Sequence, residues 1–350
     1  MCSLCSGSQG GTAMNDAFIY DEIDRRVWEE ELAPRLPARI YDAHSHSWRA
    51  AEYRCVEGND PSLPCVVEEY PPDALRAVHE RLFPGKEVGG LVFGLGTRET
   101  DLDAQNCWLA DEAGRLGYRT LMFARPDWDE QTLERQLALG HLGFKPYWFL
   151  AGDSLDAVEL EDMIPPAMLR VADRHGLIVM THIPRTGRLA DWKNVDGLRR
   201  LCAAAPRAKF VLAHLGRSYF PEAMKYFDAI CDLPNLWADC SMVQDETVIV
   251  RALSMFPRDR VMFGLDLPIA QEKGKMISVN GQRHFFTKRP HRWSVHTEPG
   301  AYEVRCTLFA YEAVRALIRG ADAAGLAQSE LDTIFWDNAQ RLIASIGQEG

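Results

Sequence analysis

The chain has 350 residues and a formal net charge of −11, and 47% of its residues are hydrophobic. A strongly negative chain lacks the basic surface that contacts to nucleic-acid phosphates require, which argues against general nucleic-acid binding. No run of uncharged apolar residues approaches the length that crosses a bilayer, and no basic start followed by an apolar core marks a secretory signal. We therefore expect a cytoplasmic protein that binds no membrane and is large enough for one big α/β domain or two ordinary ones.

The first residues and the cysteines indicate no extra site. Residues 1–14 are small and polar, and we expect a disordered tail there. The Cys2-x-x-Cys5 pair lies in this tail without a partner pair nearby, so we interpret it as tail rather than as a zinc or redox site. The nine cysteines are odd in number and follow no repeating spacing, which favours reduced thiols over a disulfide framework. An acidic helix is predicted next, over residues 16–36, and prolines near its end terminate it.

From residue 39 onward, short β-type runs alternate with longer helical patterns, which is typical of parallel βαβ units. Eight strands are predicted, at residues 39–46, 88–95, 119–125, 142–148, 177–183, 209–214, 236–240 and 260–266. Helices are predicted between them, for example at residues 104–116, 129–139, 161–175, 195–205, 221–230 and 247–256. Such a chain closes most naturally into a (β/α)8 TIM barrel, an α/β fold whose function sits at the C-terminal ends of the strands. No repeat or linker divides the chain, so we expect a single domain over residues 15–350.

Two connections are unusually long, residues 48–72 after the first strand and residues 269–299 after the eighth. Long connections in a compact domain are usually lids or binding elements. Both would rise from the face of the barrel at which the strands end.

Metal-ligand residues follow several predicted strands at the point where each strand ends. His44 and His46 lie one residue apart on the first strand, so their side chains share a face and can grip one metal ion. Such a pair is a weak signal alone, because the chain contains ten histidines. However, His182 ends the fifth strand, His214 the sixth and Asp266 the eighth. A barrel would bring these five side chains together at one mouth.

The ligand types indicate a hydrolytic metal site. Neutral imidazoles with one carboxylate suit Zn²⁺ best, with Mn²⁺ possible, and leave a coordination position open for water. The ion would lower the pKa of that water towards neutrality. Asp266, bound to the ion or beside it, would take the proton of the water and pass it to the leaving group. His214 would polarise the substrate carbonyl or stabilise an oxyanion instead of ligating the ion.

This set of motifs resembles the amidohydrolase superfamily, specifically the amidohydrolase-2 group of TIM-barrel metal-dependent hydrolases, lactonases and decarboxylases. The resemblance covers roughly residues 39 to 345, and it is carried by Asp42-Ala-His44-Ser-His46, the His182 and His214 strand ends, Phe263-Gly-Leu-Asp266-Leu-Pro268 and the late Asn338-Ala-Gln-Arg-Leu342. By resemblance to mononuclear members, one divalent ion is expected, with His44, His46, His182 and Asp266 as its ligands and His214 as a catalytic residue.

The chain departs from the pattern of this group in two ways. Leu265 precedes the strand-eight aspartate, where the group commonly has a small polar residue. Binuclear members carry a carboxylated lysine on the fourth strand, and Lys145 fits that role only if its side chain turns inward. We therefore favour one metal, with Lys145 as a substrate contact. Some related lactonases act without a metal, which the histidines alone do not exclude.

Cationic side chains recur just past the predicted strand ends and again in residues 271–296. In a chain of negative overall charge, cations on one face indicate a pocket for an anion, most simply a carboxylate held by a bidentate arginine. We expect Arg185 and Arg217, each three residues past a site histidine, to contact the substrate together with Lys145 and Tyr147. The alternative is that at least half of the arginines form structural salt bridges, and that the late loop is solvated or faces another subunit.

The sequence thus predicts a metal-dependent hydrolase that opens a small carboxylate-bearing lactone, ester or amide with a metal-activated water. The alternative keeps the fold and the metal but performs the non-oxidative decarboxylation of an aromatic or unsaturated acid. One barrel hosts both reactions, so the fold does not separate them. A third interpretation, a non-catalytic barrel that binds a metabolite or scaffolds a complex, gains nothing from residues that generate hydroxide. We expect a small anionic substrate and a homodimer.

Overall fold

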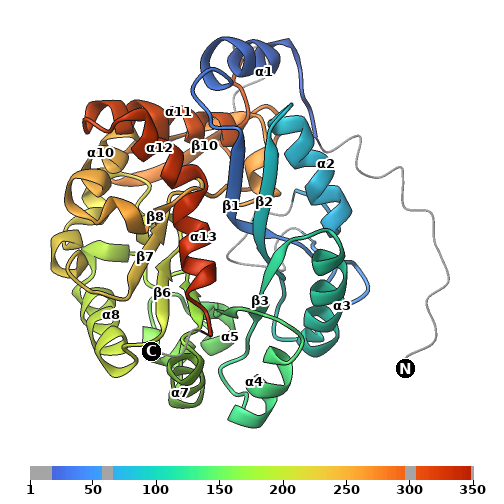
Figure 1. Cartoon of the computed structure of the whole chain (residues 1–350), viewed down its shortest axis with the longest axis vertical. Helices are drawn as coiled ribbons and strands as arrows, with labels where there is room; N and C mark the ends of the chain where they lie inside the picture. Colours follow the sequence, from blue (N-terminus) through green and yellow to red (C-terminus); the bar gives the residue numbers. More distant parts are fainter. Residues whose placement is uncertain (1–17, 57–65, 296–304, 348–350) are drawn as a thin grey trace.

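The computed structural model describes residues 18–56, 66–295 and 305–347. Its centre is a sheet of eight parallel strands in which neighbours in the sequence are neighbours in the sheet (Figure 1). These strands are β1 (Arg39–His46), β2 (Glu87–Phe93), β3 (Arg119–Phe123), β4 (Gly143–Lys145), β5 (Ile178–Thr181), β6 (Lys209–Leu212), β7 (Leu236–Asp239) and β8 (Val261–Met262). The sheet closes on itself, because the Ala43 amide donates to the Phe263 carbonyl (3.0 Å) and the His46 amide donates to the Leu267 carbonyl (2.9 Å). The predicted (β/α)8 barrel is thereby confirmed.

All eight predicted strands are present, but most end earlier than the sequence predicts. The fourth, predicted over residues 142–148, ends at Lys145 and is followed by α5 (Trp148–Ala151). Beyond the ends of the sixth and eighth strands, His214 and Asp266 have φ angles of 55° and 68°. Residues in the left-handed region depart from extended strand geometry. The segment after β8 still pairs with β1, because the Asp266 amide donates to the His44 carbonyl at 2.6 Å.

Helices follow the strands and cover the outside of the barrel (Figure 1). Four predicted helices are confirmed, as α3 (Leu102–Arg115), α4 (Glu130–Leu137), α8 (Trp192–Ala204) and α10 (Glu246–Met255). Further helices are α2 (Pro72–Leu82), α11 (Phe309–Ala323), α12 (Gln328–Phe335) and α13 (Asp337–Ala344).

Three other predicted helices are wrong in part. Residues 161–175 are split into α6 (Leu160–Met163) and α7 (Pro166–His175), because two consecutive prolines at the break lack the amide protons of a continuous helix. Residues 221–230 form two short 3-10 helices, η3 (Pro221–Met224) and η4 (Phe227–Ile230). The acidic helix consists of α1 (Glu22–Val27) and the π-helical η1 (Trp28–Leu32). Its first two predicted residues and the predicted tail lie outside the described residues.

The loop predicted over residues 269–299 contains an antiparallel hairpin, made of β9 (Gly274–Val279) and β10 (Gln282–Thr287). Its turn is Asn280-Gly281, and both residues have positive φ angles, of 52° and 68°. Asn-Gly is the pair that a tight two-residue hairpin turn favours, so this signal was present in the sequence. The other long loop is closed at its base by paired backbone hydrogen bonds between Trp48 and Tyr70.

The interior of the barrel is filled by apolar side chains. The buried residues that pack there include Phe93, Leu121, Met180, Val211 and, from α13, Leu342. A larger apolar layer lies between the strands and the surrounding helices. The polar residues at the strand ends therefore lie next to a closely packed apolar interior, as in other closed barrels.

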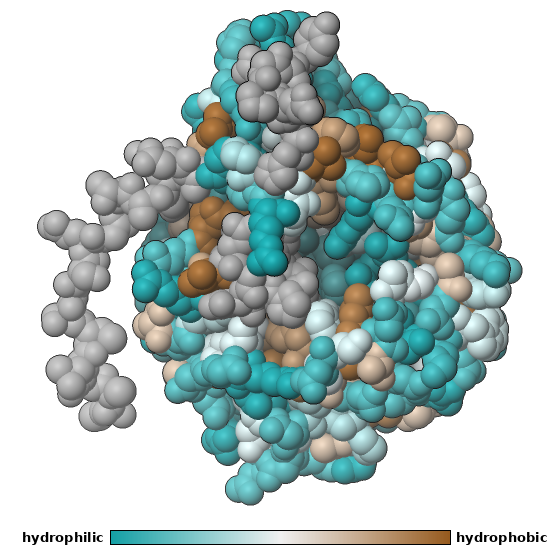
Figure 2. All heavy atoms as spheres, turned by 180° about the vertical axis from the view of Figure 1, so that it is seen from behind, coloured by the Kyte–Doolittle hydropathy of each residue, from teal (hydrophilic) through white to brown (hydrophobic). Residues whose placement is uncertain are grey.

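The structure bears on two expectations, namely that the thiols are reduced and that the chain does not span a membrane. Cys55 is disulfide-bonded, so the expectation of reduced thiols throughout is wrong at this residue, whereas the other described cysteines are free. Within the described residues, every helix is too short or too polar to cross a membrane. The face of the molecule in Figure 2 is mostly hydrophilic, with apolar residues in small separate groups.

Candidate metal centre

β1 supplies two histidines that point into the mouth of the barrel. His44 and His46 are almost fully buried. The Nδ1 atom of His44 donates to the Asp239 carboxylate at 2.9 Å, and the Nδ1 atom of His46 donates to the Gly94 carbonyl at 3.0 Å. These bonds fix the tautomer of each ring. Each Nε2 atom therefore carries a lone pair.

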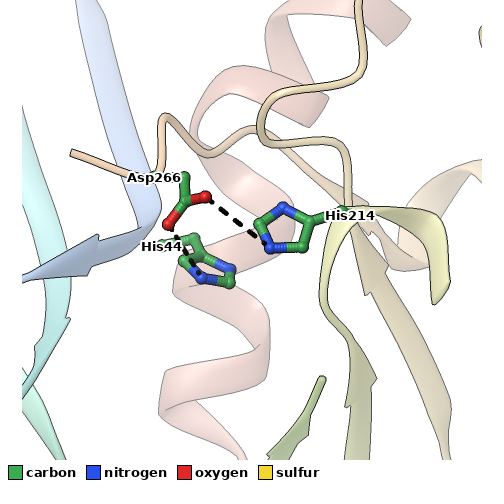
Figure 3. Close-up of side chains that lie close together, drawn as sticks. All are labelled: His44, His214 and Asp266. Atoms are coloured by element: carbon green, nitrogen blue, oxygen red, sulfur yellow. Dashed lines mark ion pairs between the residues drawn. The ribbon is translucent and has the colours of Figure 1, made fainter. Parts of the chain in front are cut away.

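Asp266 lies opposite these lone pairs, in the turn after β8. Its carboxylate oxygens are 3.6 Å from His44 Nε2, 3.5 Å from His46 Nε2 and 3.7 Å from His214 Nε2. Figure 3 shows Asp266 facing His44 and His214. The Oδ1 atom is buried and has no hydrogen-bond partner among the described residues. The Asp266 carboxylate and the Nε2 lone pairs of three histidines thus face one another, although all of them are hydrogen-bond acceptors.

His214 and His182 complete the group from β6 and β5. The Nδ1 atom of His214 lies 3.0 Å from the Ser241 carbonyl and 2.9 Å from its hydroxyl. The ligand atoms of His44, His214 and Asp266 all lie within 4.8 Å of one another. The His182 ring lies 5.5 Å from that of His214, and its Nδ1 atom has no partner among the described residues. The five residues that the sequence singled out therefore converge at one end of the barrel.

The electrostatics of this group fit a divalent cation. Burial lowers the pKa of His46 to about 3 and holds the pKa values of His44, His182 and His214 well below 6.5, so all four imidazoles are neutral. Burial also raises the pKa of Asp266 far above its ordinary value. Neutral imidazoles and a carboxylate without donors are the ligand set that Zn²⁺ and related ions prefer. A cation held by His44, His214 and Asp266 would satisfy the ligand atoms of these three residues.

Asp239 is a site residue that the sequence analysis missed. It ends β7, is fully buried, and accepts hydrogen bonds from His44 Nδ1 (2.9 Å), the His214 amide (3.0 Å) and the Ser241 amide (3.1 Å). It therefore orients two histidines at once. The signal was available, because Asp239 lies at the end of a predicted strand as Asp266 does.

The predicted substrate contacts Lys145 and Tyr147 both lie in the centre. Lys145 is fully buried, and its side chain turns inward, with Nζ 3.4 Å from His44 Nε2 and 4.5 Å from the centre of the Phe93 ring. Burial lowers the pKa of this amine. The Tyr147 hydroxyl lies 3.5 Å from His46 Nε2, and its ring stacks on His182. The Lys145 side chain therefore has the inward direction that the carboxylated lysine of binuclear members would need.

The two predicted arginines differ. Arg185 is bound to the Asp191 carboxylate at 2.6 Å, which matches the structural salt bridge considered as the alternative. Arg217 is buried, donates to the carbonyls of Ile183 (3.0 Å) and Arg185 (3.2 Å), and keeps an unpartnered Nε atom among the described residues. Of these two arginines, Arg217 is the one that has no ion-pair partner among the described residues.

A pocket opens beside the carboxylate of the centre. Besides Asp266 and His46, it is lined by Trp48, Leu95, Leu267, Pro268 and Ile269. Its walls are mostly apolar, and the polar atoms of Asp266 and His46 lie at one end. Trp48 and Ile269 begin the two long connections, so both loops contribute to the pocket, as expected of active-face loops.

The closed β/α barrel, with histidines and an aspartate at its strand ends, is typical of enzymes that bind a metal ion at this position. A comparison with models of protein families identifies the family. The amidohydrolase family model Amidohydro_2 matches residues 41–344. The chain therefore belongs to the amidohydrolase family, and the resemblance seen in the sequence is confirmed. No curated protein matches the chain.

Solved structures share the fold at low sequence identity. A probable 2-pyrone-4,6-dicarboxylic acid hydrolase from Acinetobacter baumannii is 14% identical, with 87% of this chain and 99% of that chain covered and a TM-score of 0.56. The 5-carboxyvanillate decarboxylase from Sphingomonas paucimobilis is 13% identical, with 88% and 99% covered and a TM-score of 0.55. The 4-oxalomesaconate hydratase from Rhodopseudomonas palustris is 19% identical, with 87% and 96% covered and a TM-score of 0.53. At these identities the likeness establishes the fold alone.

Proposed function

We propose that this protein is a metal-dependent hydrolase that opens a small carboxylate-bearing lactone, ester or amide. The observation that carries the proposal is the arrangement around Asp266, where three imidazole Nε2 atoms lie within 3.7 Å of a buried carboxylate. Two weak donors are present, the Lys145 amine 3.4 Å from His44 Nε2 and the Tyr147 hydroxyl 3.5 Å from His46 Nε2, but Asp266 Oδ1 has no partner among the described residues. A buried polar atom without a partner destabilises a fold, which favours a cation in this group. The similar structures act on carboxylic acids according to their names, which supports an acidic substrate.

One divalent ion, Zn²⁺ in first place and Mn²⁺ in second, fits the donors of the centre. His44 and Asp266 would hold it in every arrangement that we consider, with His46 beside them. The sequence assigned the last position to His182 and a catalytic role to His214, whereas the close grouping of His214 with His44 and Asp266 favours His214 as a ligand. His182, whose Nδ1 atom is unpartnered among the described residues, would then face the substrate.

When bound, a divalent ion supplies Lewis acidity, which polarises a carbonyl and makes water a stronger acid. The residues of the chain do the rest. Asp266 accepts the proton of the attacking water at a carboxylate oxygen and returns it to the leaving group. Lys145 and Tyr147 donate hydrogen bonds to the oxygen that becomes negatively charged.

A metal-dependent decarboxylase is the second candidate. In this reaction the carboxylate that is lost would be held by the ion, and a protonated residue of the centre would deliver a proton to the carbon. Similarity to 5-carboxyvanillate decarboxylase supports this reading as much as the pyrone hydrolase supports the first.

Two assays decide between the candidates. A panel of lactones, esters and amides is tested for acid release, and a panel of aromatic and unsaturated acids is tested for CO₂ release, each with the purified protein and its Asp266→Asn variant. Hydrolysis that falls at least about 10²-fold in the variant supports the first candidate. CO₂ release with the same dependence supports the second. If the protein releases neither acid nor CO₂ from any compound of the two panels, both candidates are contradicted.

A cytoplasmic location and a homodimer are further proposals. The Cys55 disulfide argues against the cytoplasmic location, because disulfides are rare in that compartment.

A further inference from the structure

Three arginines surround Tyr219, a buried residue next to the metal centre. The guanidinium carbons of Arg283 and Arg188 lie 4.7 Å and 5.9 Å from the centre of the Tyr219 ring. Arg217 is only two residues away in the chain. We call Arg188, Arg217 and Arg283 the arginine cluster. Its members come from distant segments, namely η2 (Arg188–Ala190), the turn α9 (His214–Arg217) and strand β10 of the hairpin.

The charges of this cluster are not neutralised within the part of the chain that the structure describes. No described acid forms an ion pair with any of the three residues, whereas Arg185 next to them is paired with Asp191. Other cations of the same late segment are also paired, among them Lys273, Lys275, Lys288 and Arg289. The Nε atoms of Arg188 and Arg217 are buried without partners among the described residues.

Bringing these guanidinium groups together is costly. Burial, and after it the positive charge of Arg283, lowers the pKa of Arg217 to about 9 and that of Arg188 to about 10. An unpaired charge that is partly removed from water destabilises the fold, so such groups are usually retained for a function. Cations that repel one another are stabilised when an anion binds between them.

The cluster faces the metal centre. The Tyr219 ring lies 5.7 Å from the His214 ring. After burial, the charges of Arg217 and Arg283 are among the influences that lower the pKa of His182, and the charge of Arg283 also reaches Asp266. An anion in the cluster would therefore belong to a molecule that extends to the reacting centre.

We propose that Arg188, Arg217 and Arg283 bind a doubly charged oxyanion group of the substrate, either two carboxylates or one phosphate, at the end away from the reacting bond. A single carboxylate has two oxygens, which can accept the paired N–H bonds of one guanidinium group. Three guanidinium groups match the larger number of oxygens and the charge of a dianion. Because Arg283 lies on the hairpin, the β9–β10 insertion supplies part of this recognition. The proposal rests on the proposed function for the identity of the ligand as substrate, but anion binding itself can be tested without turnover.

The test measures binding of three probes by isothermal titration calorimetry at low ionic strength, namely acetate, glutarate and inorganic phosphate. Wild-type protein is compared with Arg283→Gln and with Lys275→Gln. Both variants remove one positive charge from the hairpin, but Lys275 is paired with Glu312. We expect glutarate, phosphate or both to bind, acetate to bind much more weakly, and Arg283→Gln to weaken dianion binding about tenfold while Lys275→Gln leaves it unchanged. Arg283→Lys should give an intermediate value, because it keeps the charge but loses the fork.

Binding of glutarate alone assigns a dicarboxylate substrate, and binding of phosphate alone assigns a phosphate ester. The proposal is overturned if neither dianion binds more tightly than acetate, or if the two charge-removing variants weaken binding equally. Melting temperatures of all variants identify any loss of folding. Dianion binding without hydrolysis or decarboxylation would refute the proposed function and leave the anion site standing.

Discussion

At the scale of single residues, the centre depends on side chains that do not face the substrate. Asp239, Gly94 and Ser241 bind the Nδ1 atoms of His44, His46 and His214, which directs each Nε2 atom towards Asp266. Metal-binding histidines almost always have such a partner on the second nitrogen. The site is therefore preorganised by residues from β7 and from the ends of β2 and β7.

Replacing Asp239 with asparagine should weaken metal binding about 10- to 100-fold, because the neutral amide orients His44 less well and makes its Nε2 atom less basic. The measurement is competition of the protein with a chromophoric chelator for Zn²⁺. Asp228→Asn, at an exposed position, serves as the control. An affinity in Asp239→Asn equal to that of the control would show that this carboxylate has no role in the centre.

The four buried histidines should make the metal-free protein sensitive to acid. Their folded pKa values lie below 6.5, the value for an exposed imidazole, so the unfolded chain binds more protons at low pH. Their contribution to stability is fully present above about pH 6.5 and is lost as the pH falls towards the folded pKa values. Each histidine contributes up to about 1.4 kcal/mol per pH unit in that range.

Urea unfolding of the metal-free protein at pH 7.5 and pH 5.5 measures this dependence. We expect a clear fall in the free energy of unfolding at pH 5.5, and a smaller fall in His182→Asn, which removes one titrating group. Equal falls in the two proteins would mean that His182 is not held neutral by the fold.

At the scale of elements, the N-terminal helix is attached to the base of the hairpin by a buried ion pair. The Lys273 amine lies 2.7 Å from the Asp24 carboxylate of α1, and the Thr307 hydroxyl donates to the same carboxylate at 2.8 Å. Both charged side chains are shielded from water. The hairpin that carries Arg283 is thus anchored at its base to α1.

Lys273→Met should lower the free energy of unfolding by about 3 kcal/mol, because it leaves the Asp24 carboxylate buried without its cation. Lys288→Met is the matched control, since its amine lies 3.6 Å from Asp21 and is partly exposed, and a surface pair contributes about 1 kcal/mol at most. The comparison is made by chemical denaturation. If both variants lose the same small amount, the buried pair does not anchor the helix.

At the scale of the whole molecule, the sequence predicts the barrel well and the substrate site poorly. Strand order and the positions of His44, His182 and Asp266 follow from a local pattern, in which an apolar run ends in a ligand residue. The arginine cluster follows from no such pattern, because Arg188 and Arg283 meet only after the hairpin folds over the mouth. Likewise, nothing local indicated that Arg185 would pair with Asp191.

The size of the elements was also harder to predict than their order. Most strands end earlier than the apolar pattern predicts, and that pattern does not indicate the left-handed backbone of His214 and Asp266 beyond the ends of β6 and β8. The segment that forms the hairpin is predicted only as a long connection, a lid or alternatively a solvated or subunit-facing loop, although Asn280-Gly281 is a hairpin-turn signal. The sequence pattern thus predicts the repeated βα units of the barrel, and it does not predict the hairpin inserted after them.

The central claim is that the residues around Asp266 hold a divalent ion. Elemental analysis of the purified protein, expressed with zinc and manganese supplied, tests it directly when wild type is compared with His44→Asn and Asp266→Asn. We predict about one equivalent of metal per chain in wild type and a large loss in both variants, with melting temperatures showing that the variants remain folded. Wild-type protein without metal, or variants that keep the full equivalent, would contradict the account.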